Sequence, residues 1–257
     1  REGYPIGAMF GYKTDGLYQC RDFSDFYDAN GTFISDKAQQ KAIYDNIKGN
    51  NGQFTLREGV VSRGNVVEPG YLKLKKQGEG DVITSDDKVY LGSNEPKFFG
   101  GFTNRFSYKN VELSIFLQFS YGNKLFNTNH AMLRGYNNYN IEQQYYDNMW
   151  TIDRQNAPLH IYSDNIGRQT ATELQAEDAS YLKIKEISFS YRLPKKAMRH
   201  LGVKGAKVFV SGINLFTFTK YSWYDPEFSS TNPLTGGLDK YSYPTARTFN
   251  AGFSIDL

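Results

Sequence analysis

Residues 97–122 read KFFGGFTNRFSYKNVELSIFLQFSYG, and this stretch decides the fold. It consists of two runs in which apolar and polar residues alternate, joined by only two residues, Lys109 and Asn110. Alternation with a period of two is typical of β-strands, and a two-residue connection containing Asn is typical of a tight turn between antiparallel strands. The stretch therefore predicts a β-hairpin.

The length of the turn also fixes which residues of the hairpin share a face. Tyr108 is expected to pair with Val111, and each step away from the turn adds one further pair. One face then carries Phe98, Gly100, Phe102, Asn104, Phe106, Tyr108, Val111, Leu113, Ile115, Leu117, Phe119 and Tyr121. It is apolar or aromatic apart from a glycine and Asn104, where we expect a local bulge. The opposite face is polar except for Phe99 and Phe116.

Three later segments alternate in the same way and are expected to be strands: 180–193, 206–219 and 245–257. In the last of them, apolar residues occupy every second position almost without interruption. The first changes phase near Lys185, and the second changes phase around Gly212. A phase change indicates an inserted residue, so we expect a register kink at Lys185 and a bulge at Gly212.

Helical periodicity is sparse. The segment 36–48 predicts one short helix, 140–150 is a candidate for another, and one or two helical turns are expected at 194–201. Weaker strand candidates lie at 6–18 and 71–75. Because no helix is long enough to organise the fold, an all-β, antiparallel architecture is predicted.

The composition excludes several classes of protein. The 257 residues include 20 Tyr, 19 Phe and 2 Trp, yet only 39% of the chain is hydrophobic. No stretch approaches the ~20 consecutive apolar residues of a membrane helix, and the aromatic content argues against disorder. A net charge of +3 is too small to predict nucleic-acid binding. The single cysteine, Cys20, excludes an internal disulfide.

Alternating strands have two explanations, because their apolar face can lie in the core of a soluble β-sandwich or against lipid. The hairpin runs, 98–108 and 111–121, are longer than the ~5–6 residues of most globular strands and match the ~9–11 residues of membrane strands. The connections are short at one end of the expected sheet and long at the other, where they span 123–179 and 220–244. This asymmetry is typical of outer-membrane barrels.

The placement of Tyr and Trp favours the same explanation. Tyr108 and Tyr191 fall at the ends of strands that carry short turns. The ends that carry long connections hold Tyr121, Tyr181, Tyr221, Trp223 and Tyr243. Two bands of such rings are expected where a membrane meets water.

A membrane barrel of only five strands could not close, since closure takes at least ~8 strands and lipid tolerates no unpaired strand edge. We therefore expect residues 1–257 to form only the C-terminal part of a larger barrel wall. The last strand is expected to pair with a strand outside this sequence, and the opening residues, REGYP, read as the continuation of a longer chain.

The sequence resembles the C-terminal part of the SusC/RagA family of TonB-dependent outer-membrane transporters. The matching blocks, in the family's order, are EGYPIGAMFGYKTDGLYQ (2–19), PKFFGGFTNRFSYKNVELSIFLQFSYGNKLFN (96–127), MWTIDRQNAP (149–158), DASYLKIKEISFSYRLPKKAMRHLGVKGAKVFVSGINLFTFTKYSWYDPEF (178–228) and YPTARTFNAGFSIDL (243–257). They cover most of this chain but only a C-terminal portion of a typical member.

This resemblance implies a barrel of about 22 strands around an N-terminal plug domain. It also implies TonB-dependent import of oligosaccharides or peptides through the outer membrane of Gram-negative bacteria of the Bacteroidetes type. The implied partners are a SusD-like surface lipoprotein that covers the barrel, TonB, and the rest of the barrel. The plug and the N-terminal strands are expected to lie outside this chain.

Relatives often carry an acidic, EF-hand-like stretch after a Pro-Gly pair. Here the equivalent segment, 75–87, reads KKQGEGDVITSDD, with lysines, Gln77 and Thr84 where oxygen ligands are expected. The carboxylates that remain include Asp81, Asp86 and Asp87. Calcium takes about six or more oxygen ligands. We therefore predict no cofactor, and bound calcium is disfavoured.

Candidate substrate-binding residues lie in the long connections, where aromatic rings have polar neighbours. They are Tyr145, Tyr146, Trp150, Trp223, Tyr224 and Asp225. Rings stack on the C–H faces of sugars, and polar groups bond to hydroxyls; alternatively, these residues pack the loops or contact the lid protein. A second set is expected to face the lumen, towards the plug or the substrate: Arg105, Glu112, Gln118, Glu186 and Arg192.

No enzyme is predicted. The three histidines, His130, His160 and His200, are far apart and have no partner at metal-ligand spacing, and no nucleophile or phosphate-loop motif occurs. The predicted function is therefore nutrient import through an outer-membrane barrel. The alternative is a soluble β-sandwich that acts as a carbohydrate-binding or adhesin module.

Overall fold

The computed structural model describes residues 2–64, 66–130, 140–164, 170–194, 202–227, 236–240 and 242–256, together with Lys196 and Met198. The chain forms two compact units. The sheet unit comprises residues 1–7, 93–126 and 177–257, and the aromatic-core unit comprises residues 8–92 and 127–176. Each unit is described by itself.

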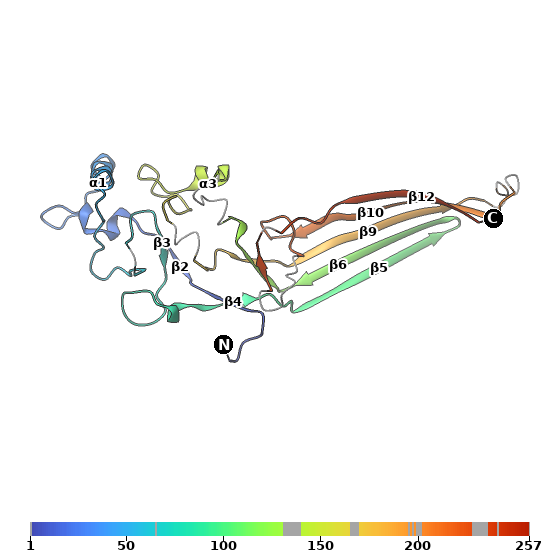
Figure 1. Ribbon diagram of the computed structural model, residues 1–257, viewed down its shortest axis with the longest axis horizontal. Helices are drawn as coiled ribbons and strands as arrows, with labels where there is room; N and C mark the ends of the chain where they lie inside the picture. Colours follow the sequence, from blue (N-terminus) through green and yellow to red (C-terminus); the bar gives the residue numbers. More distant parts are fainter. Residues whose placement is uncertain are drawn as a thin grey trace. The chain divides into compact units, whose positions relative to one another are not determined.

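Five long strands make up the sheet unit, and they run side by side in Figure 1. They are β5 (Phe98–Tyr108), β6 (Val111–Tyr121), β9 (Tyr181–Arg192), β10 (Gly205–Thr219) and β12 (Thr248–Asp256). Their order is β12-β10-β9-β6-β5, and all neighbours are antiparallel. Among the described residues, β5 and β12 are edge strands with one neighbour each in this sheet.

The predicted register of the hairpin is confirmed from Tyr108↔Val111 to Phe98↔Tyr121. The bulge expected at Asn104 is wrong, because Asn104 pairs with Ile115 in an unbroken ladder. In the turn, it is Lys109 that takes a positive φ of 53°. The residue with positive φ is thus Lys109 and not Asn110, but the register depends only on the two-residue length of the turn.

The register kink predicted at Lys185 is confirmed. Phe116 on β6 pairs with Glu186 on β9, but the next residue, Leu117, pairs with Ile184, so Lys185 is the extra residue of a β-bulge. The bulge reverses the alternation of β9 at this point. Ile184 therefore shares a face with Ile187, although the two lie out of phase in the sequence.

The bulge on β10 lies just beyond the position predicted for it. Gly212 pairs regularly with Ile187, and the register shifts between Ile213 and Phe216. Within that interval Asn214 has a φ of 55° and donates from Nδ2 to the carbonyl oxygen of Ala246 at 2.9 Å. The absence of a side chain at Gly212 leaves room for Leu215, because a Cβ at residue 212 would lie 2.6 Å from Cδ2 of Leu215.

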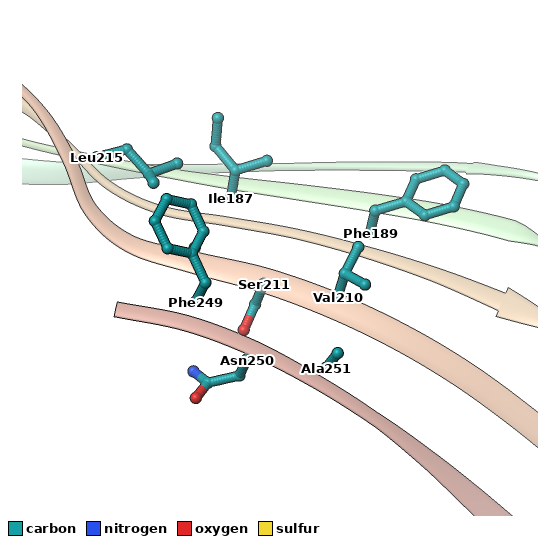
Figure 2. Close-up of a pocket in the computed structure, with 9 residues that line it drawn as sticks. Ile187, Phe189, Val210, Ser211, Leu215, Phe249, Asn250 and Ala251 are labelled. Carbon is teal, nitrogen blue, oxygen red and sulfur yellow. The ribbon is translucent and has the colours of Figure 1, made fainter. Parts of the chain in front are cut away.

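Figure 2 shows how the pairing sorts side chains onto two faces of the sheet. The apolar side chains of Ile187, Phe189, Val210, Leu215 and Phe249 lie on one face, whereas Ser211 and Asn250 point away from it. We call the first the apolar face and the second the polar face. The predicted alternation of β12 is confirmed up to residue 256, because its apolar residues pair with those of β10. Leu257 lies outside the described residues.

The apolar face is largely exposed within the sheet unit. Phe249 and Phe253 each expose 74% of their surface, Phe106 exposes 58% and Ile255 exposes 50%. A contiguous apolar surface of this size marks a face that contacts another protein surface or a membrane. The buried cluster of this unit is small and lies beyond the strand ends, where Leu125, Ala179 and Tyr221 pack with Trp223.

The other strands are short. They are β1 (Ala8–Gly11), β2 (Thr14–Leu17), β3 (Leu72–Leu74), β4 (Val89–Ser93), β7 (Lys124–Asn127), β8 (Ala176–Asp178) and β11 (Leu238–Asp239). β1 pairs with β4, β2 pairs with β3, and the third small sheet has the order β11-β7-β8. The strand candidates at 6–18 and 71–75 thus form local ladders outside the five-stranded sheet.

Two of the predicted helices are present. The helix α1 (Lys37–Gly49) begins after Asp36, whose carboxylate accepts a hydrogen bond from the backbone N–H of Gln39 at 2.8 Å. The helix α3 (Gln143–Asn148) falls within the second predicted segment. Most of the third, 194–201, lies outside the described residues, and no helix in the described part of the chain is both long and apolar enough to cross a membrane.

Packed rings form the core of the aromatic-core unit. Short 3-10 turns at Cys20–Asp22 and Ser24–Phe26 place Phe23 and Phe26 inside it, and a third such turn spans Ser85–Asp87. Phe54 stacks on Tyr44 at 5.3 Å between ring centroids, and Tyr44 lies 6.0 Å from Trp150. Such ring contacts add ~0.5–1.5 kcal/mol each beyond the area they bury. The single thiol, Cys20, is part of this core, and its burial raises its pKa to about 12.

Gly70 offers a test of this core. Its φ is +89°, and a Cβ there would lie 2.4 Å from Cε3 of Trp150. We expect Gly70→Ala to destabilise the unit by ~1–3 kcal/mol through overpacking, with backbone strain added. Gly78→Ala is the matched control, since a Cβ there meets no atom within 4 Å. Limited trypsin digestion of the complete protein should cut this unit several-fold faster in Gly70→Ala, and equal rates for the two variants would contradict the packing described.

Candidate functional site

The polar face of the sheet carries all five residues predicted to face a lumen. Register places Arg105 and Glu112 on this face in the hairpin, and their side chains form an ion pair of 3.3 Å between Nε and Oε1. Glu186 pairs with Phe116, and Arg192 pairs with Lys207, on the same face. The Arg105–Glu112 pair is exposed and contributes little to stability. That the face lines a lumen stays a prediction.

The fifth residue, Gln118, belongs to a cluster of charged side chains at the end of the strands away from the Lys109–Asn110 turn. Lys183 on β9 is 1% exposed, and its ammonium lies 2.6 Å from Oδ1 of Asp225 and 2.7 Å from Oε2 of Glu227. Lys185, the extra residue of the β9 bulge, lies 2.7 Å from the same oxygen of Glu227. Two lysines and two carboxylates thus balance in charge.

Further hydrogen bonds occupy the remaining carboxylate oxygens. Gln118 donates from Nε2 to Oε1 of Glu227 at 3.0 Å and to the hydroxyl oxygen of Tyr181 at 3.2 Å. Asp225 accepts from Oγ1 of Thr245 at 2.6 Å and from the backbone N–H of Glu227 at 2.9 Å. A buried ion pair is tolerated only when its other polar atoms are satisfied, as they are in this polar cluster.

The cluster also sets the charge state of its acids. Burial favours the neutral form of Asp225 and Glu227 and is the largest single effect on each, but the contacts with Lys183, Lys185 and Thr245 together outweigh it and hold the pKa of both carboxyls below their ordinary values. Both acids therefore stay ionised at neutral pH. Chemically, the arrangement binds the segment after β10, which contains Trp223 and Tyr224, to the polar face of the sheet.

The six predicted substrate-binding residues divide between interior and surface. Tyr145 and Trp150 are fully buried, and the hydroxyl of Tyr145 donates to the carbonyl oxygen of His160 at 2.8 Å. These two rings therefore form part of the core, which corrects the expectation that they offer their faces to a sugar. Tyr146, by contrast, is 55% exposed.

The other three predicted residues lie in the segment after β10. Tyr224 is 68% exposed and its ring lies 4.7 Å from that of Trp223, which packs on the small buried cluster. Asp225 is buried and held by Lys183, so its carboxylate anchors the segment instead of facing a ligand. A role for Tyr146, Trp223 or Tyr224 in binding stays a prediction.

The stretch 75–87 does not fit a calcium site. Asp87 is 1% exposed, and its carboxylate accepts hydrogen bonds from the backbone N–H groups of Gln77 and Thr84 at 2.9 and 2.7 Å. The ammonium of Lys76 lies 2.9 Å from the same carboxylate. A positive charge of the chain itself therefore stands where a cation would bind, and these contacts hold the pKa of Asp87 well below its ordinary value although burial opposes them.

No protein-family model matches the chain, but sequence comparison finds similar proteins. The chain is 29% identical over 262 residues to TonB-dependent receptor P3 of Formosa agariphila, with 99% of this chain and 22% of the relative covered. It is 30% identical to TonB-dependent receptor P26 of the same organism over 70% of its length, covering 19% of that relative. TonB-dependent receptor SusC of Bacteroides thetaiotaomicron is 25% identical, with 92% of this chain and 22% of SusC covered.

Solved structures with a similar fold are also known. The RagAB peptide importer in its open-open state superposes with a TM-score of 0.65 at 19% identity, covering 99% of this chain and 23% of that chain. The RagAB peptide transporter gives a TM-score of 0.66 at 18% identity, covering 96% of this chain and 22% of that chain. The fold is that of a fragment of an outer-membrane β-barrel. The chain is a homologue of TonB-dependent receptors, SusC among them, and spans about a fifth of the length of these relatives.

The polar cluster itself was missed by sequence reasoning, which selected only Gln118 and Asp225. Lys183 and Glu227 lie far apart in the sequence, and their contact depends on the path of a loop. The one available signal was the doublet Lys185-Glu186, two consecutive polar residues at the expected kink.

Replacing Lys183 by Met tests the cluster. The change leaves Asp225 without its buried cation. We therefore expect the free energy that holds residues 221–227 against the sheet to fall by ~3–5 kcal/mol. Lys185→Met is the matched control, because among the described residues the ammonium of Lys185 is paired with Glu227 alone, and its side chain is 24% exposed. Protease cleavage of the segment in the complete protein should accelerate strongly in Lys183→Met and weakly in Lys185→Met. Equal acceleration would contradict the assigned role of Lys183.

Acidification should release the same segment. Both acids have a pKa in the folded protein below the ordinary values of about 3.9 for Asp and 4.3 for Glu. Their contribution to stability is therefore complete above those ordinary values and is lost as the pH falls through the lowered ones. Cleavage by an acid-stable protease should stay slow at pH 5 and rise below about pH 4. A rise centred between pH 6 and 7 would show that another group controls the attachment.

Proposed function

We propose that this chain is the C-terminal part of the barrel of a SusC-like transporter that imports oligosaccharides or peptides through a bacterial outer membrane. The observation that carries the proposal is the exposed apolar face of the five-stranded sheet, on which Phe249 and Phe253 are each 74% exposed. Lipid covers such a face in a membrane barrel, whereas a soluble sandwich buries it in protein. Similarity to the TonB-dependent receptors supports the same assignment.

The arrangement of the connections gives the proposed orientation. The two-residue turn Lys109–Asn110 lies at one end of the sheet, which is the periplasmic end in outer-membrane barrels. The long connections and the polar cluster lie at the other end, which is then extracellular. The polar face, with Arg105, Glu112 and Arg192, lines the lumen in this arrangement.

The proposed partners follow from the open edges and from the relatives. β5 and β12 each have one neighbour in the sheet among the described residues, and the backbone groups of a free edge cannot remain unpaired in lipid. The rest of the barrel supplies strands at both edges and encloses the plug. A SusD-like lipoprotein covers the extracellular side, and TonB acts on a region outside this chain. The relatives carry the names of receptors and importers, which supports a role in transport.

The membrane assignment is tested by placing a charge on each face of β10. Val210 lies on the apolar face and is 52% exposed, whereas its neighbour Ser211 lies on the polar face. Arg on a lipid-facing strand near the middle of the bilayer costs ~2–4 kcal/mol. We expect Val210→Arg to reduce the amount of heat-modifiable transporter in isolated outer membranes, and Ser211→Arg to leave it close to the wild-type level. If Ser211→Arg were the more damaging change, the two faces would be assigned the wrong way round.

The import activity is tested with cells. Deleting the gene should abolish growth on one class of oligosaccharide or peptide as the sole nutrient, and the intact gene should restore growth. An uncoupler that collapses the proton gradient should stop uptake, because TonB-dependent import requires it. Unchanged growth on every nutrient that the parent strain uses would contradict the proposed function.

A further inference from the structure

The apolar face of the sheet has a hollow of about 560 Å³ at the end of the strands away from the Lys109–Asn110 turn. Phe119, Leu182 and Phe218 lie side by side on this face, and all three line the hollow. The Phe218 side chain is 58% exposed. Covering such side chains with hydrocarbon is favourable, so the hollow has the surface that an aliphatic chain requires.

The rim of this hollow is polar and carries charge. Lys220, Asp178 and Ser180 line it beside the rings. Oδ1 of Asp178 accepts hydrogen bonds from the backbone N–H and the hydroxyl of Ser180 at 3.0 and 2.6 Å. That hydroxyl, and then the charges of Lys220 and Lys124, hold the pKa of this carboxyl below its ordinary value although burial opposes them. Two ammonium groups thus lie near one ionised carboxylate, and a positive charge remains at the rim.

A further cation lies on the same face. Arg247 comes just before β12, and its guanidinium lies 5.8 Å from the centroid of the Phe216 ring. Phe216 pairs with Ile184 on the apolar face and is 55% exposed. The β10 bulge fixes this position, because Nδ2 of Asn214 donates to the carbonyl oxygen of Ala246 at 2.9 Å. The bulge therefore holds an arginine against a ring of the apolar face.

The two cations have no counter-charge in the part of the chain that the structure describes, where neither Lys220 nor Arg247 forms an ion pair. A charged side chain beside lipid is costly unless it is paired or reaches the boundary with water. Lys220 lies four residues beyond Phe216, which is about 13 Å along an extended strand. Two unpaired cations of this spacing can each hold a phosphate group, to which arginine donates two parallel hydrogen bonds.

One kind of molecule meets the requirements of both the rings and the cations. A soluble anion would pair the cations but leave the rings uncovered, and a neutral lipid would cover the rings but leave the cations unpaired. A second hollow of about 420 Å³, lined by Ile187, Leu215 and Phe249, lies further along the same face (Figure 2). An aliphatic chain that starts at the rim therefore finds apolar contacts beyond the first hollow.

We propose that this end of the apolar face is a binding site for a phosphorylated lipid of the outer leaflet. Its phosphate groups lie against Lys220 and Arg247, and its acyl chains lie on Phe216, Phe218 and the hollow. The inference rests on the proposed function, which assigns the apolar face to lipid and this end of the sheet to the extracellular side. It goes beyond that function because it selects one kind of lipid and names the residues that recognise it.

The experiment measures lipid binding to the complete transporter in detergent by native mass spectrometry. The fraction of transporter that carries a lipid, followed over a range of lipid concentrations, gives the Kd. The probes are diphosphoryl lipid A and the same lipid after enzymatic removal of its phosphates, with inorganic phosphate as a competitor. The variants are Lys220→Gln and Arg247→Gln. Lys207→Gln is the matched control, because Lys207 is a cation of β10 that pairs with Arg192 on the polar face.

We expect diphosphoryl lipid A to bind the wild type, and Lys220→Gln and Arg247→Gln each to weaken it about tenfold, which corresponds to ~1.4 kcal/mol. Removing the phosphates from the lipid should weaken binding at least as much, and Lys207→Gln should leave the Kd unchanged. The inference is overturned if the dephosphorylated lipid binds as tightly as lipid A, or if neither variant alters the Kd. It is also overturned if Lys207→Gln is equally damaging, or if inorganic phosphate displaces the lipid at equal concentration.

Failure of the proposed function has a different signature. A chain that is no transporter would not assemble in the outer membrane and would support no energy-dependent uptake, whatever lipid it binds in detergent. Normal assembly and uptake, together with lipid binding that is indifferent to Lys220 and Arg247, overturns the lipid site alone.

Discussion

The structure depends on one constraint, which is that the sheet must pair the backbone N–H and C=O groups of its strands and must also have its apolar face covered. Long antiparallel strands meet the first requirement internally, since each interior strand bonds to two neighbours. They do not meet the second, because Phe249 and Phe253 remain exposed. Among the described residues the sheet unit has only a small buried cluster of its own, so this face needs a partner from outside the unit.

The same constraint explains the polar cluster. A wall that is apolar on one face offers its charged groups only the other face, and there Lys183 becomes almost fully buried. A buried ammonium is stable only with close counter-charges, which Asp225 and Glu227 supply from the segment after β10. The lysine therefore fixes the course of a loop as well as satisfying its own charge.

The sequence predicted those parts of the fold in which neighbouring residues determine the outcome. The two-residue turn sets the register of β5 and β6, and the phase change in β9 locates the bulge at Lys185. It failed where distant contacts decide. Asn104 pairs with Ile115 without a bulge, because the rest of the ladder holds the two strands in register. Trp150 is buried by aromatic rings from residues 18–54, and no local sequence pattern predicts that contact. The pairing of Lys183 with Glu227 was likewise beyond reach, because loop paths have no periodicity.

The bulge at Lys185 shows how one inserted residue serves both faces. Before it, Leu182 and Ile184 point to the apolar face and Lys183 to the polar face; after it, Ile187 and Phe189 keep the apolar face continuous. Regular alternation would have turned Glu186 towards the apolar face. The insertion instead leaves Lys185 and Glu186 together on the polar side, where Lys185 reaches Glu227. An irregularity that resembles a defect of the strand pattern is thus the feature that lets an apolar wall and a charged cluster occupy the same strand.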